Sequence, residues 1–513
     1  MGKKKSVVIM ALLTIVIVVL CAITAFPVFT IPGTNGIKSW NPAVMQYDLG
    51  MDLGGGYYAY YYPVGVISES EYENNLVEES EEKEEYVRHG GLYLNTDEEY
   101  GIVENVEKDA EGNITSYKVQ QSFIDGFNAA AKEVSARFAA KGYSEHRVSI
   151  VDDYAIKVEL PASEASENYT ALQSASQALS LFALTGELQL QNTGEVIDEM
   201  NGEEVSAKDL IKSIKTKTKY EVTYIEIKFT ELGKEAFKEF KAHANSSSDS
   251  SDSGSATFDF AIENYGTLFS VDSSNMANVV DGDMIKYSIA EDSDKRYVET
   301  MVILLNSALN GGFEVEFREL TSSEVRTFAP VYNENVWYFV LGALLAALVG
   351  FIVFGIVKMG RYGVVNMYAN LSYVIITALC YAFITKGVLP VTFGSILIFL
   401  IGLVLVNVFH HFVYGGIKSE FVLGKTVESS VKGGNKKTLW AMIDVYAVLL
   451  LASLALLISA GAMQTFATQA LICVISAAFV NILWSRGINF VFLSASKDKY
   501  KYFRFVREDD DDE

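Results

Sequence analysis

Residues 6–26 read SVVIMALLTIVIVVLCAITAF, an apolar stretch without a charged side chain. An α-helix rises about 1.5 Å per residue, so this stretch is long enough to cross the roughly 30 Å hydrocarbon core of a bilayer. Three lysines precede it, as they would in a secretory signal peptide. The stretch is longer than a signal core, however, and residues 23–25 (ITA) are a poor cleavage site. We therefore interpret residues 1–27 as a transmembrane anchor helix.

Comparable apolar blocks return only after residue 336. Each is long enough to span a bilayer and contains few charged side chains. The sequence therefore predicts a six-helix all-α transmembrane bundle in a 1+5 arrangement, with five helices over residues 336–490 and an acidic cytoplasmic tail over 491–513. The five blocks lie at about 337–357, 364–384, 390–413, 438–460 and 466–484.

The short loops between these blocks differ in positive charge. Lys and Arg collect before the first block, between the second and third, between the fourth and fifth, and after the sixth. The positive-inside rule places these loops and both chain termini in the cytoplasm, and the long polar insert of residues 28–335 outside it. We therefore expect a multi-pass protein of the plasma membrane with a large extracytoplasmic domain.

The charge and the cysteines restrict what this outer domain can do. The chain has a formal net charge of −23 at pH 7, and the excess of Asp and Glu is concentrated in the insert. Such a domain does not bind nucleic acid, because phosphate neutralisation needs the opposite sign. Cys21, Cys380 and Cys473 all lie in apolar blocks, so the outer domain has no disulfide framework. The His residues are scattered, and we expect no metal, no other cofactor and no enzymatic activity.

Strand-like and helix-like periodicities alternate between residues 28 and 335, which predicts an α+β domain. We expect a base of residues 28–160 and 297–325 with an inserted head of about 163–295, both small α/β sandwiches, and a flexible linker at 245–256. The predicted strands are 47–53, 56–64, 147–150, 155–160, 187–191, 222–229, 287–289 and 313–317. The predicted helices are 68–88, 122–142, 163–182, 230–244 and 297–309.

The octet LGMDLGGG, residues 49–56, follows the anchor. Alone it indicates a turn or a bulged strand. Its position and order resemble the Leu-Gly-x-Asp-Leu-x-Gly-Gly signature of the SecD family of protein translocase subunits, which belongs to the resistance-nodulation-division superfamily. Further stretches follow in the order of that family, and the resemblance covers nearly the whole chain. They are AKGYSE (140–145), AIKVELP (155–161), TGEL (185–188), ELGKEAF (231–237) and SAL (307–309).

The residues that match the signature are expected to be structural. The glycines permit close strand packing or a bulge, and the aspartate is expected to hydrogen-bond nearby backbone. A phosphate-binding loop is excluded, because the octet is not followed by Lys and Ser or Thr. The matching residues are Leu49, Gly50, Asp52, Leu53, Gly55 and Gly56.

The resemblance implies a subunit of the bacterial protein-export machine. It implies pairing with a separately encoded SecF-type subunit and association with the SecYEG channel and with membrane lipid. In that family the outer domain holds unfolded polypeptide clients as they emerge, and movement coupled to the proton gradient prevents backsliding.

The fourth predicted helix departs from the family, whose members carry an Asp there in a Val-Asp-Ala-Asn-Val motif. Residues 388–419 contain no carboxylate. His410 and His411 could titrate near neutral pH and replace the acid, or they could be an interfacial pair. Asn407 cannot titrate and is expected to form interhelical hydrogen bonds.

Asp444 lies in the fifth apolar block, in the stretch MIDVY, and resembles an Asp that the family carries on that helix. A carboxylate at membrane depth usually faces a partner or a water path, so Asp444 is a candidate proton-relay residue. The alternative is a residue near the cytoplasmic end that snorkels or hydrogen-bonds to Tyr446, a second polar side chain of this block.

Two other functions stay open at this point. One is half of a proton-driven transporter of the resistance-nodulation-division type, although such pumps usually carry two outer domains in one chain. The other is a non-transporting scaffold subunit, which the missing carboxylate of the fourth helix favours.

Overall fold

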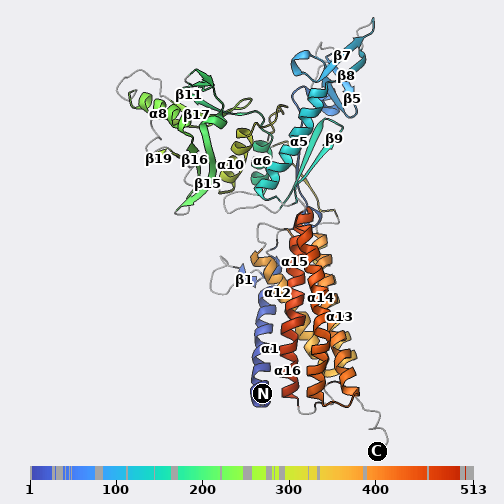
Figure 1. Cartoon of the computed structure of the whole chain (residues 1–513). Coiled ribbons are helices and arrows are strands. Elements are labelled where there is room, and N and C mark those ends of the chain that lie inside the picture. Colours follow the sequence, from blue (N-terminus) through green and yellow to red (C-terminus); the bar gives the residue numbers. More distant parts are fainter. Residues whose placement is uncertain are drawn as a thin grey trace, which may run out of the picture. The chain divides into compact units, whose positions relative to one another are not determined.

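The computed structural model describes two compact units (Figure 1). The helical unit consists of Met1–Gly55 and Ala329–Glu513, and the α+β unit consists of Gly56–Phe328. Much of the expected linker at 245–256 and the acidic end of the tail lie outside the described residues. Those described are 3–25, 29–30, 39–40, 42–45, 47, 49–74, 85–110, 114–143, 145–162, 171–200, 202–219, 222–246, 257–272, 280–281, 284–287, 295–321, 323–331, 335–384, 390–458, 462–496, 499 and 503.

The described part of the helical unit contains five helical segments that are long and apolar enough to cross a membrane, and the chain is a membrane protein. One segment, Val336–Phe383, reverses direction at the 3-10 turn Gly360–Tyr362. A Cβ on Gly355 would lie 2.3 Å from Nδ2 of Asn366, so the two halves of this segment pack as an antiparallel pair. The predicted 1+5 order of helices is therefore present in the described residues.

These helices run side by side in Figure 1. They are α1 (Lys3–Ala25), α11 (Val336–Met359), α12 (Gly363–Ile384), α13 (Phe393–Val422), α14 (Val427–Leu456), and α15 (Ala462–Phe479), which continues through a π-helical turn (Val480–Trp484) into α16 (Ser485–Ala495). Shorter elements of this unit are β1 (Phe29–Thr30), β2 (Ser39–Trp40), a 3-10 turn (Ala43–Met45) and α2 (Met51–Gly54).

Helices α13 and α14 extend beyond the apolar blocks predicted for them. The additional turns bury Ile417 and Phe421 of α13, and Val427 and Val431 of α14, in one shared core. A hydropathy pattern ends at the first charged residues, whereas a single apolar stripe is enough to pack an amphipathic helix against its neighbour.

The base of the α+β unit is built on an antiparallel sheet in the order β21-β3-β10-β9. Strands β3 (Gly56–Tyr61) and β10 (Ala155–Pro161) approach closely at Gly56, where a Cβ would lie 2.0 Å from the Leu160 carbonyl oxygen. Helices α5 (Gln121–Lys141) and α6 (Ala171–Phe182) share one core with this sheet. The other elements are β9 (Arg147–Val151), β21 (Arg326–Phe328), β4 (Val66–Ser68), α3 (Glu69–Asn74), β5 (Tyr86–His89), β6 (Leu92–Asn95), a 3-10 turn (Glu98–Tyr100), β7 (Val103–Lys108) and β8 (Ile114–Val119).

The head has a second core between two four-stranded antiparallel sheets and helices α8 (Glu231–Ser246) and α10 (Lys295–Leu309). One sheet orders β12 (Glu195–Val196), β11 (Leu188–Asn192), β17 (Thr257–Ile262) and β18 (Gly266–Asp272). The other orders β15 (Ile211–Lys219), β16 (Val222–Phe229), β20 (Met284–Tyr287) and β19 (Val280–Asp281). A small hairpin of β13 (Glu199–Met200) and β14 (Glu203–Glu204) and helix α7 (Ala207–Leu210) complete the head.

Three predicted elements differ from the structure. The predicted strand at 47–53 is wrong, because Met51–Gly54 forms helix α2. The predicted helix at 68–88 is also wrong at its end, where Tyr86–His89 pairs with β6 as strand β5. Residues 313–317 form no strand, although Phe317 makes an isolated bridge to Pro63. Strand β5 pairs with β6, the next strand along the chain, in a hairpin with the register His89 to Leu92. The bridge of Phe317 instead joins it to Pro63, which is distant in sequence and which local periodicity does not reveal.

The two cores also divide the chain differently from the expected base and head. Helix α6, expected in the head, buries Leu179 and Phe182 in the base core. Most of the buried face of α10, expected with the base, lies in the head core, for example Val298 and Leu305. Amphipathic periodicity shows that one face of a helix is buried, but it does not show which sheet covers that face.

The chain crosses between base and head at two adjacent places. The amide of Gly186 donates to the carbonyl of Phe313 at 3.4 Å, and Gly186, Gly311 and Gly312 all have positive φ. Arg137 of α5, only 1% exposed, contacts both crossings. Its Nη1 donates to the carbonyls of Phe182 and Leu184 at 2.9 and 2.6 Å, and its guanidinium lies 4.6 Å from the centre of the Phe313 ring. Its Nε donates to Oγ of Ser307 at 2.9 Å.

Candidate functional site

The interior of the helix bundle contains a group of polar side chains that we call the polar layer. A buried polar group in a membrane bundle usually carries a hydrogen bond, and it often marks a path for ions or protons. Every member of the layer is at most 4% exposed. The members are Asn366 and Asn370 of α12, Asn407 and His410 of α13, Tyr446 of α14 and Asn481 of the π-helical turn.

Three asparagines join α12 to α13. Nδ2 of Asn366 and Nδ2 of Asn370 both donate to Oδ1 of Asn407, at 3.0 and 3.1 Å. Nδ2 of Asn407 in turn donates to Oδ1 of Asn370 at 2.7 Å and to the carbonyl of Leu403 at 2.8 Å. The interhelical hydrogen bonds predicted for Asn407 are therefore present. The side-chain amide of Asn407 donates both of its hydrogens and accepts two hydrogen bonds, so it holds α12 and α13 together.

The second half of the layer joins α13, α14 and the π-helical turn. Nδ2 of Asn481 donates to the hydroxyl of Tyr446 at 2.6 Å. The ring of Tyr446 packs against Phe409, with ring centroids 5.2 Å apart. The π-helical turn places Asn481 on this interior face, and such turns occur frequently at functional sites.

His410 and Asn481 line a small cavity of about 10 Å³, which is close to the minimum that holds one water molecule. Nδ1 of His410 lies 3.2 Å from the Val406 carbonyl, whereas its Nε2 is buried without a described hydrogen-bond partner. Oδ1 of Asn481 and Nε and Nη2 of Arg486, which also lines the cavity, are likewise buried and unpaired among the described residues. A water in this cavity would have donors and acceptors within the layer.

The other titratable candidates lie apart from the layer. His411 is half-buried beside the ring of Phe354 of α11, with ring centroids 5.2 Å apart. Asp444 is exposed on α14, whereas Met442 and Tyr446 are buried. Residues two apart on a helix do not face each other, so the hydrogen bond considered between Asp444 and Tyr446 does not form. Asp444 remains a candidate only through a group outside the described chain.

Asn366, Asn370 and Asn481 were not singled out from the sequence. Asn366 and Asn370 are one helical turn apart inside an apolar block, and Asn481 lies near the end of another. An amide inside a membrane block is a detectable signal, because it requires a partner in the bundle. That signal would have identified all three.

The glycine-rich octet anchors the helix that carries Asn407 and His410. Leu49 forms a bridge with Val391, and the amide of Gly50 donates to the Val391 carbonyl at 2.9 Å. Oδ2 of Asp52 accepts from the backbone N–H of Phe393 at 2.7 Å. Asp52 therefore bonds backbone as predicted, but at the first residue of α13, where a negative charge also favours the helix dipole. Leu53 is buried, Gly55 adopts a positive φ, and Gly56 begins β3.

No protein-family model and no curated protein matches this sequence. Among solved structures, the chain is similar to SecDF in its super-membrane-facing form, with a TM-score of 0.52, 15% identity, and coverage of 96% of this chain and 58% of that one. SecDF from Thermus thermophilus, described as a translocon-associated membrane protein, aligns with a TM-score of 0.42 and 16% identity over 97% of this chain and 60% of that one. The chain thus spans less than two thirds of the length of either SecDF chain. At a TM-score of 0.52 over nearly its whole length, this chain has the fold of the matching part of SecDF.

Proposed function

We propose that this chain is a SecD-type subunit of the bacterial protein-export machine. The observation that carries the proposal is the SecDF fold over 96% of the chain, together with the octet at residues 49–56. Both termini lie in the cytoplasm, and the α+β unit lies outside the plasma membrane and holds unfolded polypeptide that emerges from a SecYEG channel. A SecF-type subunit supplies the portion of SecDF that this chain does not match. The chain performs no catalysis itself.

His410 is the side chain through which this subunit responds to the proton gradient. It is the member of the polar layer with a basic side chain, because the amide groups of the asparagines do not titrate and the hydroxyl of Tyr446 is an acid. Its side chain lines, together with Asn481, a cavity large enough for one water, which could deliver a proton. Asp444 is the alternative, and it requires a partner that covers the exposed face of α14.

The test compares gradient-dependent export in inverted membrane vesicles that contain His410→Gln, His411→Gln or Asp444→Asn. Glutamine retains hydrogen bonding and removes titration. We expect His410→Gln to lower gradient-dependent export while ATP-driven export without a gradient is unchanged, and His411→Gln to behave as the wild type. If only Asp444→Asn lowers gradient-dependent export, Asp444 and not His410 is the residue that responds to the proton gradient. No loss with either would place the proton path in the partner subunit.

A second candidate function is a non-transporting scaffold. The observation that favours it is the composition of the polar layer, which contains no Asp or Glu among the described residues. Glu420 and Glu428, the carboxylates near the ends of α13 and α14, are paired with Lys425 and Lys499. Co-purification separates the candidates together with the vesicle assay. Retention of SecF-type and SecYEG subunits without gradient dependence supports the scaffold, and absence of both subunits contradicts export and leaves the transporter alternative.

A further inference from the structure

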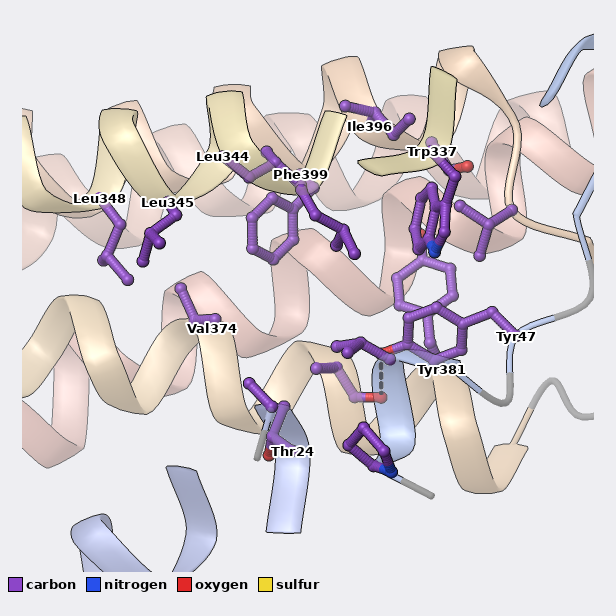
Figure 2. A pocket seen from close by; sticks show the side chains of 17 residues that line it. Thr24, Tyr47, Trp337, Leu344, Leu345, Leu348, Val374, Tyr381, Ile396 and Phe399 are labelled. Atoms are coloured by element: carbon purple, nitrogen blue, oxygen red, sulfur yellow. Dashed lines mark hydrogen bonds between the residues drawn. The ribbon is translucent and has the colours of Figure 1, made fainter. Parts of the chain in front are cut away.

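The helical unit contains an apolar cavity of about 350 Å³ between α1, α11, α12, α13 and the segment that precedes the octet (Figure 2). This volume falls within the range of roughly 300–1,000 Å³ that is typical of ligand sites. Figure 2 shows Leu344, Leu345 and Leu348 of α11 on one side and Val374 of α12 on the other. The rings of Tyr47, Trp337 and Tyr381 close one end, where Tyr47 makes edge contacts to Trp337 and Tyr381 at 6.3 and 6.2 Å.

The hydroxyl groups of Tyr47, Thr24 and Ser395 at the cavity already donate to backbone carbonyls. The hydroxyl of Tyr47 donates to the carbonyl of Ala378 at 2.9 Å. Oγ1 of Thr24 donates to the carbonyl of Leu20, and Oγ of Ser395 donates to the carbonyl of Thr392. Among the described residues that line it, none is Lys, Arg, His, Asp or Glu. The described wall therefore offers no opposite charge to a charged group and few free polar atoms to the peptide groups of an extended polypeptide.

The volume and the surroundings favour a single hydrocarbon chain. An α-helix is about 10–12 Å across with its side chains and rises about 5.4 Å per turn, so one turn already occupies more than the 350 Å³ of the cavity. Leu345 lines the cavity and is nevertheless 61% exposed, so the wall at α11 opens onto the outer surface of a helix that is apolar enough to lie in a bilayer. Lipid tails surround that surface.

We propose that this cavity binds one acyl chain of a membrane phospholipid, with the head group left outside. A free fatty acid is a poorer occupant, because its carboxylate would find no basic side chain among the described residues of the cavity wall. The tail packs against the C-terminal end of α1, against α12, and against the first turns of α13. The proposal rests on the membrane location of these helices and does not depend on a role in export.

The test uses the full chain in lipid nanodiscs that contain a trace of phosphatidylcholine with a diazirine at the middle of one acyl chain. After irradiation, peptide mass spectrometry maps the cross-links. We expect cross-links on cavity residues such as Leu344, Val374 and Phe399 to exceed those on Val448 and Leu451, which face outward from α14. A parallel sample with diazirine-labelled palmitic acid distinguishes the free acid from the phospholipid.

Two substitutions fill the cavity, Leu344→Trp and the milder Ala378→Val, and Val448→Trp is the matched exposed control. We expect the filling variants to reduce cavity cross-links to the level of the α14 surface, and the control to leave them unchanged. Cavity cross-links no stronger than those of α14 in the wild type would overturn the proposal without any variant. Labelling by palmitic acid alone, or labelling that persists in both filling variants, would also contradict it.

Discussion

Substitution of Arg137 by Met should destabilise the α+β unit by about 2–6 kcal/mol, because two buried carbonyl oxygens lose their donor. Methionine retains the apolar part of the side chain. It leaves the carbonyls of Phe182 and Leu184 without the donors that Nη1 supplies at 2.9 and 2.6 Å. A buried acceptor without a partner costs about 1–3 kcal/mol, so two of them account for the expected loss. Burial lowers the pKa of Arg137 to about 10, so the guanidinium is still charged at neutral pH.

The assay is the unfolding of residues 56–328 in urea, monitored by circular dichroism. Arg137→Lys retains the charge but loses the planar guanidinium with its several N–H donors. Its free energy of unfolding should therefore lie between those of Arg137→Met and the wild type. Arg147→Met is the control, since that side chain is 70% exposed and lies 3.5 Å from Glu159 in a surface pair, where losses stay below about 1 kcal/mol. Because Arg137 touches both crossings, its loss should also separate the unfolding of base and head into two transitions. A single transition with a loss below about 1 kcal/mol would refute the bridging role.

Three further outcomes are expected. The fragment 56–328 should fold without the membrane helices and melt identically with and without reductant, because both of its cores are internal and no Cys lies within it. Burial raises the pKa of Glu71, but hydrogen bonds from Arg318 and Ser68 outweigh it and the net pKa is lowered. Glu71 therefore stabilises the fold above its unfolded pKa of about 4.5 and loses this effect as the pH falls through its lower folded pKa. Glu71→Gln should lower the melting temperature at pH 7, and the difference from the wild type should shrink on acidification below the unfolded pKa. Asn407→Leu should lower the melting temperature of the detergent-solubilised chain, since each lost interhelical hydrogen bond costs about 0.6–1.7 kcal/mol, whereas Val408→Leu on the exposed face should not.

The apolar blocks predicted the six helices and their order, because the length of a membrane span is fixed by the bilayer. They could not predict which face of α14 would be buried. Asp444 and Tyr446 lie on opposite faces, and only the packing of Met442 and Tyr446 decides that Asp444 points outward. Asn407 was predicted as a tie between helices, but its partners on α12 were not, because hydropathy does not pair residues across a bundle.

The octet illustrates the same limit. Its glycines indicated a strand or bulge, and a local hydrogen bond was expected for Asp52. The actual acceptor–donor pair joins Asp52 to Phe393, far along the chain. The N-cap of α13 is its own Thr392, which the sequence of the helix contains, whereas the carboxylate that accepts from the Phe393 N–H comes from another segment and leaves no trace in that sequence.

Because the two crossings between base and head are adjacent, the head is a domain inserted into the base at one place. Its first and last residues already touch, since the amide of Gly186 reaches the carbonyl of Phe313. An inserted domain whose two ends are adjacent can be removed without displacing the strands and helices of the domain that carries it. The head could thus be excised and its ends joined by a few glycines, or another domain with adjacent termini could be grafted in its place, while the base sheet keeps its register.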